Sequence, residues 1–93
     1  MPRLTLTLLR ALVRRLEYVV SLHAAEELED DDLTILDLES ILITGRIVER
    51  QHDRITGETK CLVEGITVNG LSAAAVVKLG HNGRLFVVTV WLD

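Results

Sequence analysis

The chain has 93 residues, of which 48% are hydrophobic and 26% charged, and its net charge is −4. This length suits a single domain over residues 1–93 with one modest core, and the composition excludes a disordered chain. No apolar run approaches the ~18 residues that a membrane helix needs, and arginines interrupt the N-terminal apolar stretch, which excludes a signal peptide. The single cysteine, Cys61, provides neither a disulfide framework nor a cysteine metal site. We therefore expect a protein of the reducing cytoplasm.

The charges are distributed unevenly along the chain. Residues 1–22 carry four arginines and one glutamate, residues 23–45 carry eight acids and no lysine or arginine, and residues 46–93 carry six basic and five acidic groups. Binding to phosphates draws most of its affinity from a basic face, so this acidic balance disfavours RNA and gives no reason to expect DNA or a membrane as partner. With only three aromatic residues, a base-stacking platform is also not expected.

The first predicted helix covers about residues 6–16, and Pro2 suits a position at a helix start. An apolar stripe at every fourth residue supports it, formed by Leu4, Leu8, Leu12 and Leu16. A strand over residues 4–8 is the competing interpretation, because apolar and polar residues alternate there. Residues 18–20 then form a short strand.

A second helix is predicted over residues 23–29. Ser21 is a favourable N-cap, because its hydroxyl can accept a hydrogen bond from a free N–H of the first turn. The run Asp30-Asp31-Asp32 ends the helix, since acids are unfavourable at the negative end of the helix dipole.

The third predicted helix begins after Thr34 and has the best-defined ends. Thr34 and Asp37 have the spacing of a capping box, and Leu33 and Leu38 that of a hydrophobic staple. Gly45 marks the end of the helix, because glycine readily adopts the left-handed conformation that ends many helices.

The rest of the chain predicts an antiparallel meander of four strands. Asn69-Gly70 and Asn82-Gly83 are strong hairpin signals between runs of β-branched residues. The expected strands are residues 46–51, 60–68, 71–79 and 84–92. The fold class is therefore α+β, with a helix, a short strand and two helices before the sheet, whose helices pack on one face.

One ordered set of residues resembles a known prokaryotic family, domain of unknown function 4258. The set begins with Ser21-x-His23-Ala24-x-x-Glu27-Leu28 and Leu33-Thr34, which opens the capped helix ending at Gly45. It continues through Cys61-Leu62-Val63-x-Gly65, Asn69-Gly70, Ala75-Val76-Val77 and Val88-Thr89-Val90-Trp91. The resemblance implies a fold similar to that of RelE-like toxin ribonucleases, and an antitoxin-like protein as a partner.

Two departures from the family pattern bear on activity. The family usually has Arg after the helical Glu, where this chain has Leu28, and it favours Arg and a later His where this chain has Leu71-Ser72-Ala73-Ala74. Both changes remove groups that could contact phosphate, so a nuclease of this type would be catalytically degenerate.

His23 is the first candidate for chemistry. On a helix, Glu26 and Glu27 follow it by three and four residues, so either carboxylate could orient the imidazole as a general base. A structural pairing and metal ligation remain open as alternatives, although no second set of ligands supports a metal.

The second candidate group is basic and lies on the first hairpin, with Arg46 and Arg50 on the predicted strand, His52 directly after it, and Arg54 and Lys60 nearby. RNA cleavage through the 2′-hydroxyl needs a base, an acid and cations, and this group could provide them. Arg46, Arg50 and His52 share strand parity and should point to one face while the strand lasts. The alternative is an edge strand that its charges keep from aggregating.

Other motifs carry less. Gly80-His81-Asn82-Gly83 has the spacing of a backbone-clamping loop, but between two strands it predicts a hairpin turn. No nucleotide, hydrolase or metal motif is present, so no cofactor and no metal are expected.

These patterns predict a relative of the toxin-type RNA endonucleases, either active or catalytically degenerate, with His23, Glu27, Arg46, Arg50 and His52 as candidate catalytic residues. The alternative function is a non-catalytic interaction module that self-associates, or binds a partner, through the apolar strand at residues 71–79.

Overall fold

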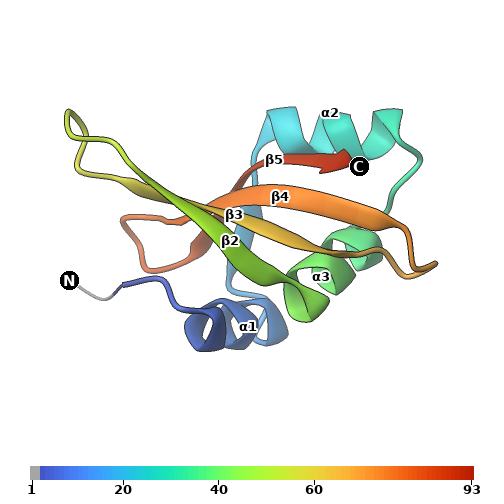
Figure 1. Ribbon diagram of the computed structural model, residues 1–93, viewed down its shortest axis with the longest axis horizontal. Helices are drawn as coiled ribbons and strands as arrows, with labels where there is room; N and C mark the ends of the chain where they lie inside the picture. The colour runs from blue at the N-terminus through green and yellow to red at the C-terminus, as the bar shows by residue number, and fades with distance from the viewer. Residues whose placement is uncertain (1–2) are drawn as a thin grey trace.

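The computed structural model describes residues 3–93, so the prediction for Pro2 lies outside the described part. Within it, three helices and five strands follow one another, and every predicted element has a counterpart (Figure 1). The elements are α1 (Leu6–Arg14), β1 (Tyr18–Val20), α2 (Leu22–Asp30), α3 (Ile35–Thr44), β2 (Arg46–His52), β3 (Thr59–Ile66), β4 (Ser72–Leu79) and β5 (Leu85–Leu92). This confirms the α+β class. None of these helices is long and apolar enough to cross a membrane.

The five strands form one mixed sheet in the order β1-β5-β4-β3-β2. Strands β2 to β5 are the predicted antiparallel meander. The prediction of four antiparallel strands was wrong on one point, because β1 joins the sheet parallel to β5, with Tyr18 beside Leu85 and Val20 beside Val87. The register of such a short parallel strand depends on the helices between the two strands, which a local sequence pattern does not encode.

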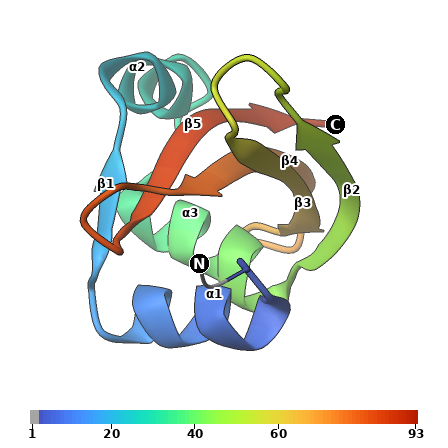
Figure 2. The ribbon, with the colours of Figure 1, turned by 90° about the vertical axis from the view of Figure 1, so that its left-hand side faces the viewer.

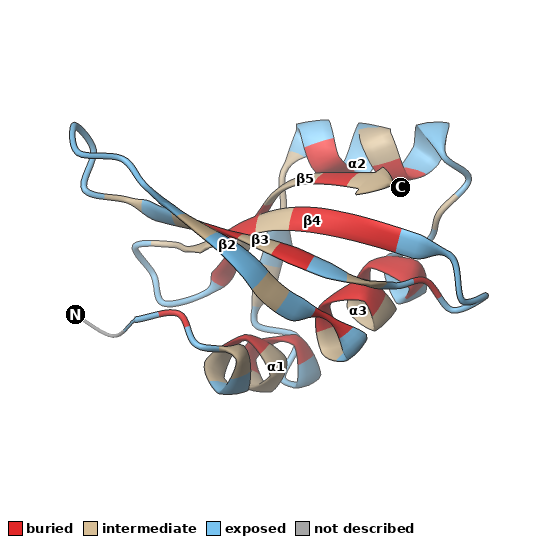
Figure 3. Ribbon diagram, in the orientation of Figure 1, coloured by how far each residue is buried: buried red, intermediate tan, exposed pale blue. Residues whose placement is uncertain are grey.

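The sheet is curved, and α3 lies in its concave face, where it packs on β3 and β4 (Figure 2). Helix α1 packs against α3 and β5 on this same side. We call this the inner face and the opposite side the outer face. Helix α2 lies instead along β5, near the edge of the sheet that is opposite to β2 (Figures 1 and 2). The buried residues gather between the inner face and the helices, whereas β2 and the turn after it are largely exposed (Figure 3).

Helix α1 ends earlier than predicted. Thr5 caps its start by accepting a hydrogen bond from Leu8 N, and Leu9, Leu12 and Val13 are buried along one side. The helix stops at Arg14 because Leu16 adopts a left-handed conformation with φ of 58°. Leu16 is therefore exposed rather than part of the apolar stripe.

Helix α3 has the predicted ends, but the expected left-handed conformation of Gly45 was wrong: its backbone is extended, with φ of −76° and ψ of 170°, and leads directly into β2. The capping box of Thr34 and Asp37 is formed in both directions. Asp37 also accepts a hydrogen bond from Val68 N, at 3.0 Å, which ties the start of the helix to the β3–β4 turn. Gly65 lets the helix approach β3 closely, since a Cβ there would collide with the carbonyl of Ile41.

The predicted Asn-Gly turns are confirmed in position. Each contains a hydrogen bond across four residues, from Gly70 N to Thr67 O and from Gly83 N to Gly80 O, both 3.0 Å long. Both glycines have φ near 80°, a region that residues with a side chain rarely adopt. The meander places the β2–β3 and β4–β5 turns at one end of the molecule, together with the N-terminal segment (Figure 1).

Candidate functional site

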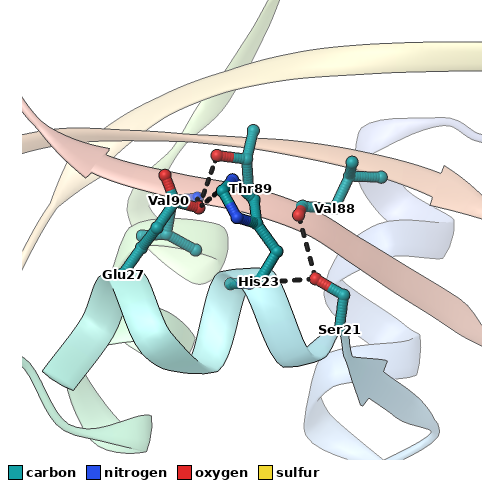
Figure 4. A network of polar contacts seen from close by, with 7 residues as sticks. Ser21, His23, Glu27, Val88, Thr89 and Val90 are labelled. Carbon is teal, nitrogen blue, oxygen red and sulfur yellow. Dashed lines mark hydrogen bonds and ion pairs between the residues drawn. The ribbon is translucent and has the colours of Figure 1, made fainter.

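The first turns of α2 are fastened to the edge of β5 by polar side chains (Figure 4). Ser21 is the N-cap of the helix and accepts a hydrogen bond from Ala24 N, as predicted. Its hydroxyl also donates to Val88 O, at 2.9 Å. After β1 ends, this edge of β5 has no neighbouring strand, whereas its other edge pairs with β4. The Ser21 hydroxyl therefore provides one of the hydrogen bonds that a neighbouring strand would provide.

Glu27 extends this role by one helical turn. Its Oε1 accepts hydrogen bonds from Thr89 Oγ1 at 2.5 Å and from Val90 N at 3.0 Å. His23 Nε2 lies 3.4 Å from the same oxygen, and the His23 side chain is 69% exposed. One carboxylate oxygen therefore has three neighbours, two of which belong to β5 (Figure 4).

These contacts determine what the predicted His23–Glu27 pair can do. The Glu27 oxygen nearest His23 already accepts two hydrogen bonds that hold α2 on β5, and the His23 side chain itself is largely exposed, so the carboxylate serves the fold first. The contacts therefore favour the structural interpretation of the pair. Among residues 3–93, no three histidine, cysteine or acidic side chains come together as metal ligands.

The basic residues of β2 do not share one face. Arg46 pairs with Glu64 and Ile47 with Val63, but Glu49 pairs with Leu62, so Val48 is an extra residue in the strand. Such a bulge reverses the parity of the residues that follow it. Arg50 and His52 therefore point to the inner face, as their shared parity predicted, and Arg46 points to the outer face. The prediction that all three lie together was wrong, because the bulge is not visible in the sequence.

Arg50 is held at the inner face by the start of the chain. Its Nη1 donates to Leu4 O at 2.7 Å and lies 3.4 Å from Cys61 Sγ. Cys61 is fully buried, and burial raises the pKa of its thiol. The sulfur is therefore a neutral neighbour of Arg50, and the guanidinium keeps its charge for other partners.

A cleft of about 480 Å³ lies at this end of the molecule, between the N-terminal segment, the β2–β3 turn and the β4–β5 turn. Figure 2 looks onto this end. The polar side chains that line the cleft are Arg3, Arg50, Thr56, Glu58, Thr59 and His81. Three parts of the chain, the N-terminal segment, the β2–β3 hairpin and the β4–β5 turn, thus bring two arginines and a histidine to one cavity.

Two further contacts border the cleft. His52 Nδ1 lies 3.0 Å from Thr59 Oγ1, which places this predicted residue beside the cleft wall. Lys78 Nζ donates to Glu58 Oε2 at 2.5 Å. This hydrogen bond holds the pKa of the Glu58 carboxyl below its usual value. Glu58 is therefore ionised and neutralised by Lys78, which leaves the arginines as the unpaired charges of the cleft.

The charges of the chain are separated in space. The cleft end contains three acids, Glu17, Asp53 and Glu58, whereas its basic residues are Arg3, Arg50, Arg54, Lys60, Lys78 and Arg84. The run Glu29–Asp32 lies at the other end of the long axis, where α2 leads into α3 (Figure 1). A chain with net charge −4 therefore has one basic end, which the net charge conceals.

The five predicted site residues belong to three places. His23 and Glu27 are together at the α2–β5 edge, Arg50 and His52 are at the cleft, and Arg46 stands apart on the outer face. Strands β5 and β2 are three positions apart in the sheet, which corresponds to roughly 14 Å between them. The two groups therefore do not form one site.

The sequence analysis missed Arg3 and His81 as cleft residues. Arg3 precedes the first helix, and His81 was assigned only to a hairpin turn. One signal could have found His81, because alternate turns of a meander lie at the same end of the sheet. The predicted meander therefore implies that the β2–β3 and β4–β5 turns lie at the same end of the sheet. No sequence signal places Arg3, since its position depends on how α1 packs.

The comparisons with known proteins are consistent with the sequence resemblance. Residues 20–92 match the family described as Domain of unknown function (DUF4258). The match covers α2, α3 and strands β2 to β5, includes only the last residue of β1, and leaves out α1 and Arg3. No curated protein and no solved structure matches the chain. The resemblance to RelE-like toxins accordingly stays a prediction. Because the match spans most of its length, the chain belongs to the family of domain of unknown function 4258.

Proposed function

We propose that this domain binds single-stranded RNA at the basic cleft and cleaves it, as a relative of the toxin-type endoribonucleases. The observation that carries the proposal is the cleft itself, in which Arg3, Arg50 and His81 line one cavity at the basic end. Unpaired arginines in a concave site suit the oxygens of a phosphate, because a guanidinium can donate two parallel hydrogen bonds.

The charge separation supports the binding step. Phosphate binding releases condensed counterions, so its affinity depends on the local basic surface and falls steeply with salt. Six basic residues against three acids form such a surface at the cleft end. The acidic run Glu29–Asp32 lies at the other end of the molecule and would repel the phosphates of RNA there (Figure 1). RNA would therefore bind only at the cleft end of the domain.

The groups at the cleft also match the needs of cleavage. One imidazole, from His52 or His81, would take the proton of a ribose 2′-hydroxyl while the 2′-oxygen attacks the adjacent phosphorus. The other would protonate the departing 5′-oxygen, which leaves a 2′,3′-cyclic phosphate on one fragment and a 5′-hydroxyl on the other. Arg3 and Arg50 would stabilise the charge that develops on the phosphate oxygens. No water enters this step, and every proton has a donor and an acceptor.

The experiment is a cleavage assay with purified protein and a short end-labelled RNA, beside a DNA of the same sequence. The expected result is cleavage of the RNA alone, with a cyclic phosphate product, because DNA lacks the 2′-hydroxyl. His81→Ala should reduce the rate by at least ~100-fold, and Arg3→Ala should weaken binding and make it less sensitive to salt.

Arg15→Ala is the matched control, since Arg15 is an exposed arginine at the far end of α1. It should bind and cleave like the wild type. The proposal would be overturned by a folded wild type that leaves RNA intact at high protein concentration. Equal losses in Arg3→Ala and Arg15→Ala would also contradict it, since they would indicate a general charge effect.

A second candidate function is self-association, and one patch favours it. Strand β4, suggested by the sequence as a pairing strand, has β3 and β5 on its two sides and cannot pair with another chain. The β3–β4 turn instead exposes Ile66, Val68 and Leu71, which are 45%, 63% and 52% exposed. Contact between two such turns would remove this apolar surface from water. Sedimentation over a wide concentration range tests this, and a monomer throughout would refute it. An antitoxin-like partner would be the remaining interaction to test.

A further inference from the structure

A second hollow lies on the outer side of the β4–β5 turn and shares Gly80 and His81 with the cleft. Its volume is about 380 Å³, within the range of small-ligand sites. Its other side chains come from β1, β4 and β5 and the turn, and they are Val19, Lys78, Asn82, Arg84, Leu85 and Phe86. The hollow differs from the cleft because an aromatic ring, that of Phe86, forms part of its wall.

The register of the sheet brings Phe86 and its neighbours together. Val19 lies beside Phe86 in the parallel pair, and Lys78 lies beside it in the antiparallel pair. The three side chains therefore stand in one row on the outer face. Phe86 is half-buried in this row, between Val19 and Lys78, so part of its ring stays accessible to a ligand.

Lys78 connects the hollow to the cleft. Its Nζ lies 5.3 Å from the centre of the Phe86 ring and donates to Glu58 in the cleft wall. The lysine thus supports the ring on one side, and its charge is already neutralised by Glu58. Arg84 keeps a free charge at the hollow, so an occupant beside Phe86 would also have a cation within reach.

We infer that this hollow accepts one nucleobase of the RNA strand whose phosphate occupies the cleft. The inference rests on the proposed function, and it adds the part of the ligand that the cleft does not recognise. An aromatic ring and a neighbouring arginine suit the flat face of a base, and stacking of this kind tolerates every base. Because the two cavities meet at Gly80 and His81, a single nucleotide can span the turn, with His81 between its base and its phosphate.

Three aromatic residues do not make a platform for a run of bases, as the composition indicated. One ring beside a phosphate site is sufficient for one base. We therefore expect specific contact with a single nucleotide, and contact through phosphates alone on either side of it.

The test compares two labelled probes by fluorescence anisotropy: a single-stranded RNA of eight nucleotides whose 2′-hydroxyls are methylated, so that it cannot be cleaved, and an inorganic polyphosphate of similar charge. Phe86→Leu keeps an apolar side chain but removes the ring. It should bind the RNA about tenfold more weakly, as expected for the loss of one base stack, and should bind polyphosphate within twofold of the wild type.

Trp91→Leu is the matched control, because Trp91 is a half-buried aromatic residue on the same strand but lines neither cavity. It should bind both probes like the wild type, and circular dichroism and thermal melting check that both variants are folded. If the wild type binds both probes and Phe86→Leu binds RNA equally well, the nucleobase site is wrong and the phosphate cleft stands. If the wild type binds neither probe, the proposed function itself fails, and the base site fails with it.

Discussion

The α2–β5 edge and the basic cleft contain the same kinds of side chain in opposite situations. At the edge, Ser21 and Glu27 direct their polar atoms at β5, and His23 adds to a carboxylate already in use (Figure 4). At the cleft, Arg50 uses one nitrogen to hold the N-terminal segment, and Glu58 is neutralised by Lys78. At the edge the hydrogen bonds hold α2 on β5, whereas at the cleft the basic side chains outnumber the acidic ones.

This difference shows that a histidine beside a glutamate on a helix is not by itself a sign of catalysis. The deciding question is which partners the carboxylate already has, and that question needs the tertiary structure. The comparison can be tested because it predicts opposite consequences. Substitutions of Ser21 and Glu27 at the edge should lower the stability and leave RNA binding intact. Substitutions at the cleft should weaken RNA binding and leave the stability intact.

The largest effect on stability is expected for Glu27→Ala. The change removes the acceptor of Val90 N, and Val90 is buried, so a strand N–H loses its partner. The free energy of unfolding should fall by about 2 kcal/mol, measured by chemical denaturation. Glu27→Gln keeps an oxygen acceptor and should lose much less. Equal stability of the alanine variant and the wild type would show that the edge network is not structural.

Ser21→Ala is expected to have the next largest effect. It removes the N-cap of α2 and the hydrogen bond to Val88 O, and the loss should be about 1 kcal/mol. Thermal or urea unfolding measures it. Ser21→Thr retains a hydroxyl and is the control, which should stay closer to the wild type than the alanine variant does.

A smaller effect is expected for the two exposed histidines, and they separate the regions most clearly. His23→Ala should change the free energy of unfolding by less than ~0.5 kcal/mol, because the side chain is largely exposed, and it should leave RNA cleavage unchanged. His81→Ala should be as stable as the wild type and lose cleavage. The reverse assignment, with activity lost only in His23→Ala, would move the site to the α2–β5 edge.

The smallest effect concerns pH and the wall of the cleft. The hydrogen bond from Lys78 holds the pKa of Glu58 below its usual value of 4.5. The folded state therefore prefers the ionised carboxylate, and this contribution is present above pH 4.5 and is lost as the pH falls below that value. The stability of the wild type should accordingly decline more steeply below pH 4.5 than that of Glu58→Gln. Parallel declines in denaturation experiments between pH 5 and 3 would argue against the ion pair.

The sequence predicted the elements whose ends depend on local chemistry. Thr34 and Asp37 form a capping box wherever the helix packs, and the glycines after Asn69 and Asn82 favour turns through their own backbone freedom. Ser21 was found for the same reason. These features involve residues within a few positions of each other, so a local pattern is sufficient to predict them.

The features that decided the site are not local. The extra residue Val48 turns Arg46 away from Arg50. Strand β1 pairs with β5, although α2, α3 and three strands separate the two along the chain. Arg3 reaches the cleft because the chain before α1 lies against Arg50. The candidate residues were therefore partly correct as a set, but the sequence could not assign them to separate places.

The most direct test of the central claim is an NMR titration of the isotope-labelled wild type with a short single-stranded RNA. The account predicts salt-sensitive shifts of backbone amides in the N-terminal segment, the β2–β3 turn and the β4–β5 turn, with α2 unchanged. Shifts centred on α2 around His23 and Glu27, with the cleft unaffected, would contradict it and restore the helix as the functional site.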